Sequence, residues 1–144
     1  MEPKSSKNEK YSIITSYNLV LKRIVNFYHE KCPNKNSSYA HIRRCRIFVD
    51  ADPKSALEIT GSKLFKYKDI IMAKRPDKIS HNVDEEKQET LSEYTTQKDI
   101  AGQLVENVLL VWRTMEPQDK EDLADQLIDM LKLYIRYLIT EKDD

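Results

Sequence analysis

Apolar side chains recur at intervals of three and four residues along most of this chain, which is the spacing of one face of an α-helix. The first series predicts a helix of about 18 residues that stops before Pro33, because proline cannot continue a helix. Its apolar positions are Tyr17, Leu21, Ile24 and Tyr28. A second, shorter helix should follow the turn after Pro33, with Tyr39, Ile42, Cys45 and Val49 on one side.

The middle of the chain contains clear start and stop signals for helices. Asp52 and Pro53 indicate a helix start, because aspartate accepts hydrogen bonds from free backbone N–H groups and proline is tolerated at the first helical position. Gly61 either ends a short helix or weakens a longer one. The apolar stripe then continues through Leu64, Tyr67, Ile70 and Ile71, and Arg75-Pro76 stops it.

The last third of the sequence predicts two helices separated at Glu116-Pro117. The apolar stripe of the first contains Ile100, Leu104, Val108, Val111 and Met115, with Trp112 beside it. One face of the second contains Leu123, Leu127, Met130, Tyr134 and Leu138, and it is widened by Ile128, Leu131, Ile135 and Ile139. Because this apolar surface is so wide, we expect the last helix to be buried on two sides.

These patterns predict the all-α fold class, as a compact bundle of about four to five helices. A flexible polar tail is expected over residues 1–10, a single helical domain over 11–140 and a short tail over 141–144. Within the domain, a charged loop over 75–96 should separate a basic N-terminal half from an acidic pair of helices. The one β-like run, Ile47-Phe48-Val49, is too short to form a sheet.

Composition narrows the function classes. Charged residues make up 33% of the 144 residues and hydrophobic ones 40%, so the chain is polar yet able to fold. Only two glycines occur, which disfavours phosphate-binding glycine loops and dinucleotide-binding motifs. No apolar run is long enough to cross a membrane and the N-terminus lacks a secretory signal, so we expect a protein that is not secreted and works in a reducing compartment.

The net charge of zero conceals an asymmetry between the two halves of the chain. Residues 1–75 hold 16 Lys and Arg against 7 Asp and Glu, whereas residues 76–144 hold 8 against 17. One interpretation is that the two halves attract each other within the fold. The other is that opposite charges join copies of the chain head to tail, as a homo-oligomer, or dock it on a charged partner.

Two histidines and two cysteines form the strongest candidate for a metal site. His29 and Cys32 lie three residues apart, and His41 and Cys45 lie four apart, so each pair would share a helix face. Four such ligands could hold zinc tetrahedrally. The competing interpretation, which we favour, is that both cysteines are small core residues and no cofactor is bound.

A cluster of basic residues is the strongest candidate for a binding surface. It contains Lys22, Arg23, Arg43, Arg44, Arg46, Lys66 and Lys68. Such a cluster could neutralise the phosphates of a nucleic acid, although basic clusters more often are solvated or bind an acidic protein surface. No serine, histidine or carboxylate stands in a spacing typical of catalysis, which favours a protein that is not an enzyme.

The order of these segments resembles a group of short, uncharacterised helical proteins of nucleocytoplasmic large DNA viruses. The matching stretches are FYHEKCP at Phe27–Pro33, KYKDII at Lys66–Ile71 and the Trp-containing end at Val111–Leu138, within a similarity over residues 13–139. The chain departs from the group after Met72, where AKRPDKI replaces an acidic and aromatic segment.

This resemblance implies a viral setting, in the virion or in the cytoplasm or nucleus of the host cell. We therefore predict a non-enzymatic structural or protein-interaction role, as a minor capsid-associated component that binds the major capsid protein or other virion proteins. The alternative prediction is a nucleic-acid-binding or host-modulating factor that uses the arginine-rich second helix.

Overall fold

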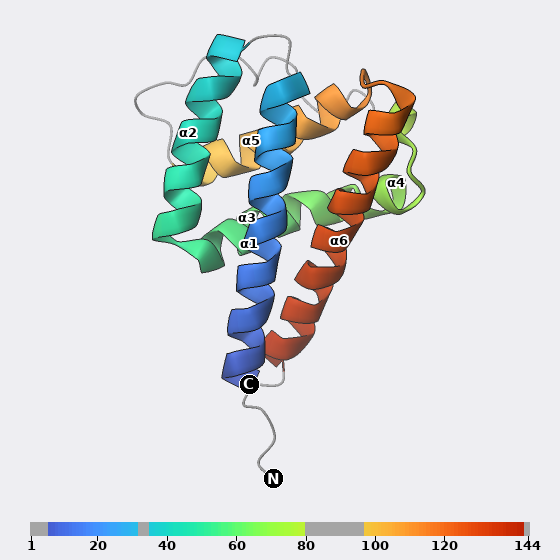
Figure 1. Ribbon diagram of the computed structural model, residues 1–144. Coiled ribbons are helices and arrows are strands. Elements are labelled where there is room, and N and C mark those ends of the chain that lie inside the picture. Colours follow the sequence, from blue (N-terminus) through green and yellow to red (C-terminus); the bar gives the residue numbers. More distant parts are fainter. Residues whose placement is uncertain (1–5, 32–34, 80–96, 143–144) are drawn as a thin grey trace.

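Figure 1 shows the computed structural model, which describes residues 6–31, 35–79 and 97–142. These ranges form helices and connecting turns without any strand, which confirms the all-α class. The α-helices are α1 (Ser6–Lys31), α2 (Lys35–Ala51), α3 (Pro53–Lys66), α4 (Lys68–Met72), α5 (Gln97–Trp112) and α6 (Pro117–Lys142). A short 3-10 turn, η1 (Pro76–Lys78), follows α4. Most of the predicted charged loop, residues 80–96, lies outside the described ranges.

The helix boundaries follow from local chemistry at several points. The carboxylate of Asp52 accepts a hydrogen bond from the backbone N–H of Ser55 at 3.2 Å, and Pro53 occupies the first position of α3, as predicted. The predicted third helix breaks into α3 and α4 at Tyr67, whose N–H bonds to the carbonyl of Leu64 three residues back and tightens the turn. Ile47 and its neighbours belong to α2, since tertiary packing overrides their β propensity.

The first helix is longer than the sequence predicts. α1 has 26 residues and begins at Ser6, inside the stretch that we expected to be a flexible tail. Its first turns are tied to the end of α6, because Lys10 pairs with Glu141 at 3.3 Å and Glu9 lies 3.9 Å from Arg136. These ion pairs stabilise the turns of α1 that precede its apolar stripe. The sequence prediction used the apolar stripe alone and therefore began the helix too late.

The helices form two crossed layers around one core. In Figure 1, α1 and α6 run side by side and converge at the end where α1 begins and α6 ends, with α2 next to α1. Behind them, α3 and α5 cross the first layer. Between the layers lies a continuous apolar cluster, and its fully buried side chains include Ile13, Leu57, Leu64, Leu104, Leu109, Trp112 and Leu123.

The layers approach each other closely where α3 crosses α6. Gly61 lies within α3, against the ring of Tyr134 of α6, and a Cβ atom at this glycine would stand only 2.2 Å from Cδ1 of the ring. Gly61 therefore neither ends a helix nor merely weakens one. It removes a side chain at the crossing point, so that the backbone of α3 can approach α6 closely enough for Phe65, four residues later, to stand 6.1 Å from Tyr134 between ring centroids.

The turn that follows α4 is a second point of attachment to α6. Lys74 follows α4 with φ of 54°, and the N–H of Arg75 bonds to the carbonyl of Ile70 at 3.1 Å, which is the Schellman pattern of helix ends. The ammonium of Lys74 bonds to Glu121 at 2.5 Å and to Asp125 at 2.9 Å, both on α6. The chain thus turns back at a lysine in the left-handed region, and Ile79 becomes buried just beyond it.

The opposite charges of the two halves meet inside this fold. Basic residues of the first half pair with acids of the second in Lys10–Glu141, Lys31–Asp119, Lys54–Glu141, Lys63–Glu106 and Lys74–Glu121. Most of these pairs are exposed and contribute little individually to stability. Their distribution nevertheless favours the interpretation that the charge asymmetry is largely satisfied within one molecule.

One prediction about α6 is wrong. Its first face is buried as expected, with Leu127 and Met130 each 1% exposed. The second face, which we expected to be covered as well, is open over about the last two turns, where Ile135 is 41% exposed and Ile139 57%. Leu138, at the end of the first face, is 38% exposed as well. The helices that the chain provides cover only one side of this segment, so a wide apolar helix surface remains in contact with solvent.

Candidate functional site

The open surface of α6 forms one wall of a groove, here called the α6 groove. It encloses about 690 Å³ and is lined by Phe65, Lys68, Ile135, Leu138, Ile139, Glu141 and Lys142. The lining is mostly apolar, with charged groups at its margin. Exposed apolar side chains that are adjacent and rimmed by charge are typical of a surface that binds another macromolecule.

The spacing of α6 places the lining residues together. Ile135, Leu138, Ile139 and Lys142 stand at positions i, i+3, i+4 and i+7, which fall on one face of a helix. The opposite wall comes from the α3–α4 junction. There Phe65 packs against Tyr134, and the ammonium of Lys68 lies 4.0 Å from the centre of the Phe65 ring. Both walls therefore depend on the close crossing of α3 and α6 at Gly61.

Among the described residues, the charges at the margin of the α6 groove that have no ion-pair partner are positive. Glu141 is already engaged, because its carboxylate accepts a hydrogen bond from Tyr137 at 2.8 Å and pairs with Lys10 and Lys54. The hydrogen bond from Tyr137 and the one from Lys10 hold the pKa of Glu141 below its usual value. Neither Lys68 nor Lys142 has a carboxylate within ion-pair distance among the residues that the structure describes.

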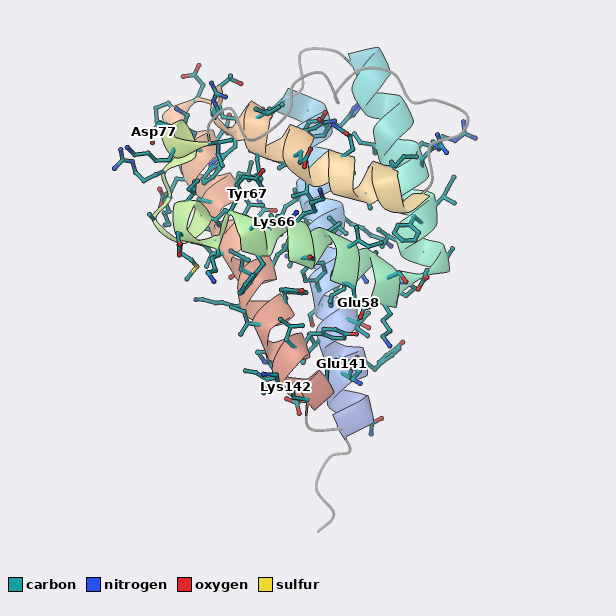
Figure 2. All side chains as sticks on the ribbon, turned by 180° about the vertical axis from the view of Figure 1, so that it is seen from behind. Glu58, Lys66, Tyr67, Asp77, Glu141 and Lys142 are labelled. Atoms are coloured by element: carbon teal, nitrogen blue, oxygen red, sulfur yellow. The ribbon has the colours of Figure 1, made fainter. Side chains whose placement is uncertain are left out.

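Figure 2 shows how these groups are distributed along the groove. Glu141 and Lys142 stand together at the carboxyl end of α6, whereas Lys66 and Tyr67 mark the α3–α4 junction farther along the helix. Lys142 is eight residues beyond Tyr134, which corresponds to about 12 Å along a helix axis. Lys142 thus stands at the α6 end of the apolar floor, and Lys68 belongs to the wall on the other side.

A second, more polar groove lies where α1 meets the turn between α2 and α3. It encloses about 440 Å³, and its lining includes Tyr11, Ile14, Asn18, Leu19, Lys22, Asp50 and Pro53. Its charges are largely paired with each other, since Lys22 bonds to Asp50 at 2.8 Å. The amide of Asn18 donates to the carbonyl of Pro53 at 3.0 Å, while its buried Oδ1 has no partner. This groove offers fewer unpaired charges than the α6 groove.

The structure separates the predicted basic cluster into two groups. Lys22 and Arg23 on α1 neighbour the α2 arginines, whereas Lys66 and Lys68 belong to α3 and α4. In Figure 1, α2 and α4 lie at opposite sides of the molecule. The sequence-predicted cluster is therefore not one continuous surface.

Within the α1–α2 group, several side chains are engaged with the protein itself. Arg46 donates a hydrogen bond to the side-chain carbonyl of Asn26 on α1, and Lys22 pairs with Asp50. Arg23 and Arg43 are exposed, and Arg44 is half-buried. Arg46 thus helps to hold α2 against α1, and the exposed arginines could also meet an anionic partner.

The candidate zinc ligands are not brought together as far as the structure describes them. Cys45 is a free thiol that is fully buried in the core, and burial raises its pKa to about 12, which disfavours the thiolate that binds metal. His29 is half-buried on α1. Cys32 and the side chain of His41 lie outside the described residues. Among the side chains that are described, no three of the types His, Cys, Asp and Glu gather as a metal site.

A small apolar cavity lies within the described part of the core. A cavity of about 10 Å³ among Leu21, Leu64, Leu104 and Met130 is wholly apolar and too small for a substrate. The buried hydroxyl of Tyr17 is bonded to that of Thr60 at 2.7 Å, and burial raises the pKa of this tyrosine. These polar groups satisfy each other within the core.

Comparison with known proteins finds no match for this chain. No protein-family model, no curated protein and no solved structure matches it. Within the described part of the chain, none of the helices combines the length and the apolar character that crossing a membrane requires. The class of protein is thus defined by the fold and its surface: an all-α bundle with an apolar groove between α6 and the α3–α4 junction.

Sequence reasoning identified most of the groove residues but assigned them to the core. Ile135, Leu138 and Ile139 were predicted to be apolar helix positions, and Lys68 was part of the basic cluster, whereas Phe65 and Lys142 were not singled out. The signal that could have indicated the groove is the width of the apolar face of the last helix. An apolar face wider than one neighbouring helix can cover, ending in a lysine, indicates a surface for a partner outside the chain.

Proposed function

We propose that this protein is a non-enzymatic protein-interaction protein that binds a partner through the α6 groove. The observation on which the proposal rests is the exposure of Ile135, Leu138 and Ile139 on a helix whose other face is fully packed. Apolar side chains that remain in water after folding can still be removed from water by a partner, which provides a driving force for association.

The geometry of the described residues supports binding rather than turnover. The groove is open and apolar, and its acidic group is held by neighbouring cations. The cavity of about 10 Å³ among the described core residues is too small to hold a reactant. The resemblance to proteins of large DNA viruses supplies the proposed setting, in which the partner is a capsid or other virion protein and this chain is a minor component of the particle.

Site-specific crosslinking in the cells that produce this chain tests the proposal. A photoreactive amino acid at Leu138 should yield a covalent adduct with a discrete protein, whereas the same group at Asp122, exposed on the acidic part of the same helix, should not. Equal adducts at both positions, or none at Leu138, would contradict a binding role for the groove. Mass spectrometry of purified virus particles tests the setting separately.

A second candidate function is nucleic-acid binding through the α1–α2 group of basic residues. The observation that favours it is the exposure of Arg23 on α1 and of Arg43 and Arg46 on the neighbouring α2. Contacts of this kind neutralise phosphates and give an affinity that falls steeply as salt increases. The partial engagement of Arg46 with Asn26 makes this surface less available than the α6 groove.

A further inference from the structure

We infer that the partner of the α6 groove is an amphipathic α-helix whose apolar face is flanked by acidic side chains. This inference rests on the proposed function and specifies the partner's chemistry. It follows from the length of the apolar floor along α6 and from the charges at its margin.

The shape of the groove favours a helix. Its floor follows α6 from Ile135 to Lys142, which is about two helical turns or roughly 10 Å. Phe65 and Lys68 line its other side, so the floor is a shallow apolar depression along the end of α6. A partner helix fits such a surface by laying side chains at i, i+3 or i+4, and i+7 against it.

The charges at the margin favour acidic residues in the partner. The carboxylate of Glu141 forms ion pairs with Lys10 and Lys54. Among the charged lining residues, Lys68 and Lys142 therefore have no carboxylate partner in the described structure. An acidic partner side chain would pair with each lysine, whereas a basic one would be repelled.

The same charges disfavour a second copy of this chain as the occupant. Two α6 grooves brought face to face would place Lys68 and Lys142 of one copy against lysines of the other. The acidic part of α6 could supply opposite charge, but its exposed residues, such as Glu121 and Asp125, present no apolar side chains and already bind Lys74. A symmetric dimer would therefore satisfy either the apolar floor or the charged margin, but not both.

A displayed peptide library provides the test. The library contains helices of about three turns, with an apolar face of varied Leu, Ile, Met and Phe and with Glu, Gln or Lys at each flanking position. It is selected on the full-length chain and sequenced. We expect Glu to exceed Lys about tenfold at the two flanking positions, and the enriched peptides to shift the NMR signals of Ile135, Leu138 and Ile139.

Matched variants separate the groove from overall charge. The double variant K68E/K142E should reverse the preference, so that Lys is enriched in place of Glu. The control K78E/R113E makes the same change in net charge at exposed residues that do not line the groove, and it should leave the preference for Glu unchanged. Circular dichroism checks that each variant retains the helical fold.

The remaining outcomes each overturn the inference in a recognisable way. Enrichment without charge preference, or with equal effects of both double variants, would refute the acidic partner while leaving the Leu138 crosslink and the proposed function intact. Binding of anionic lipid vesicles with no enriched peptide would identify a membrane surface instead. A dimer in sedimentation experiments that is abolished by Leu138→Glu would identify a second copy. Absence of both enrichment and the Leu138 crosslink would refute the proposed function as well.

Discussion

Replacing Gly61 by alanine should destabilise the protein, although the same change in an ordinary helix would stabilise it. Glycine inside a helix costs about 1 kcal/mol relative to alanine, so the substitution starts with a gain. At this position the new Cβ would stand 2.2 Å from Cδ1 and 2.7 Å from Cγ of Tyr134, well inside van der Waals contact. The ring of Tyr134 is only 9% exposed, so it has little space into which it can move.

Overpacking costs roughly 1–3 kcal/mol, and an approach of 2.2 Å belongs in the upper part of that range, about 2–3 kcal/mol. After the gain in helix propensity of about 1 kcal/mol, we expect a net loss of about 1–2 kcal/mol. For a domain of this size the loss corresponds to a decrease in Tm of about 3 to 8 °C, measured by circular dichroism at 222 nm. The expected sign is as informative as the magnitude, because helix propensity alone predicts an increase in Tm.

Gly102→Ala is the matched control. A Cβ at Gly102 would meet Cε of Lys63 at 3.1 Å, and the end of a lysine side chain can move aside. This variant should therefore be neutral or stabilised by up to about 1 kcal/mol. In a Tyr134→Ala background Gly61→Ala should become stabilising, because the clash is gone. If Gly61→Ala raised Tm as much as the control does, the close crossing of α3 and α6 would be refuted.

Three further perturbations test other parts of the description. Leu127→Ala should lower the free energy of unfolding by about 2–5 kcal/mol in urea titrations, because this side chain is 1% exposed in the core; an unchanged unfolding midpoint would contradict that burial. Glu141→Gln should reduce stability at neutral pH, because the carboxylate of Glu141 has a depressed pKa and contributes stability only while it is ionised. The difference in stability from the wild type should therefore shrink as pH falls below 4.5. A difference that is constant down to pH 3 would refute the ion pairing. Neutralising Arg43, Arg44 and Arg46 together should abolish any salt-sensitive shift of labelled DNA, and DNA binding that survives the change would exclude the α1–α2 surface as its site.

The helices themselves could be predicted from the sequence because their signals are local. Spacings of three and four identified the buried positions Tyr17, Leu21 and Leu127, and Asp52-Pro53 identified the start of α3. Each of these features depends on neighbours within one or two helical turns. Tertiary structure then reinforced the local preference, which is why the all-α class is confirmed.

The groove could not be predicted because it depends on what the rest of the chain leaves uncovered. Periodicity predicts that Ile135 and Leu131 both lie on a buried face of the helix, yet Leu131 is 1% exposed and Ile135 is 41% exposed. Which of the two is buried depends on the angle at which α3 crosses α6, and Gly61 sets that approach through a contact 73 residues away in sequence. The pairing of Glu141 with Lys10, which makes the margin positive, is equally long-range.

The antiparallel arrangement of α1 and α6 has a mechanical consequence. Because the first turn of α1 and the last turn of α6 lie together, a force that pulls these two ends apart would peel the helices from each other one contact at a time, beginning with Lys10–Glu141. Ile139 and Lys142 stand at that same end. A bound partner that spans them would act as a clamp on the opening, so tension on the ends and occupancy of the groove would oppose each other.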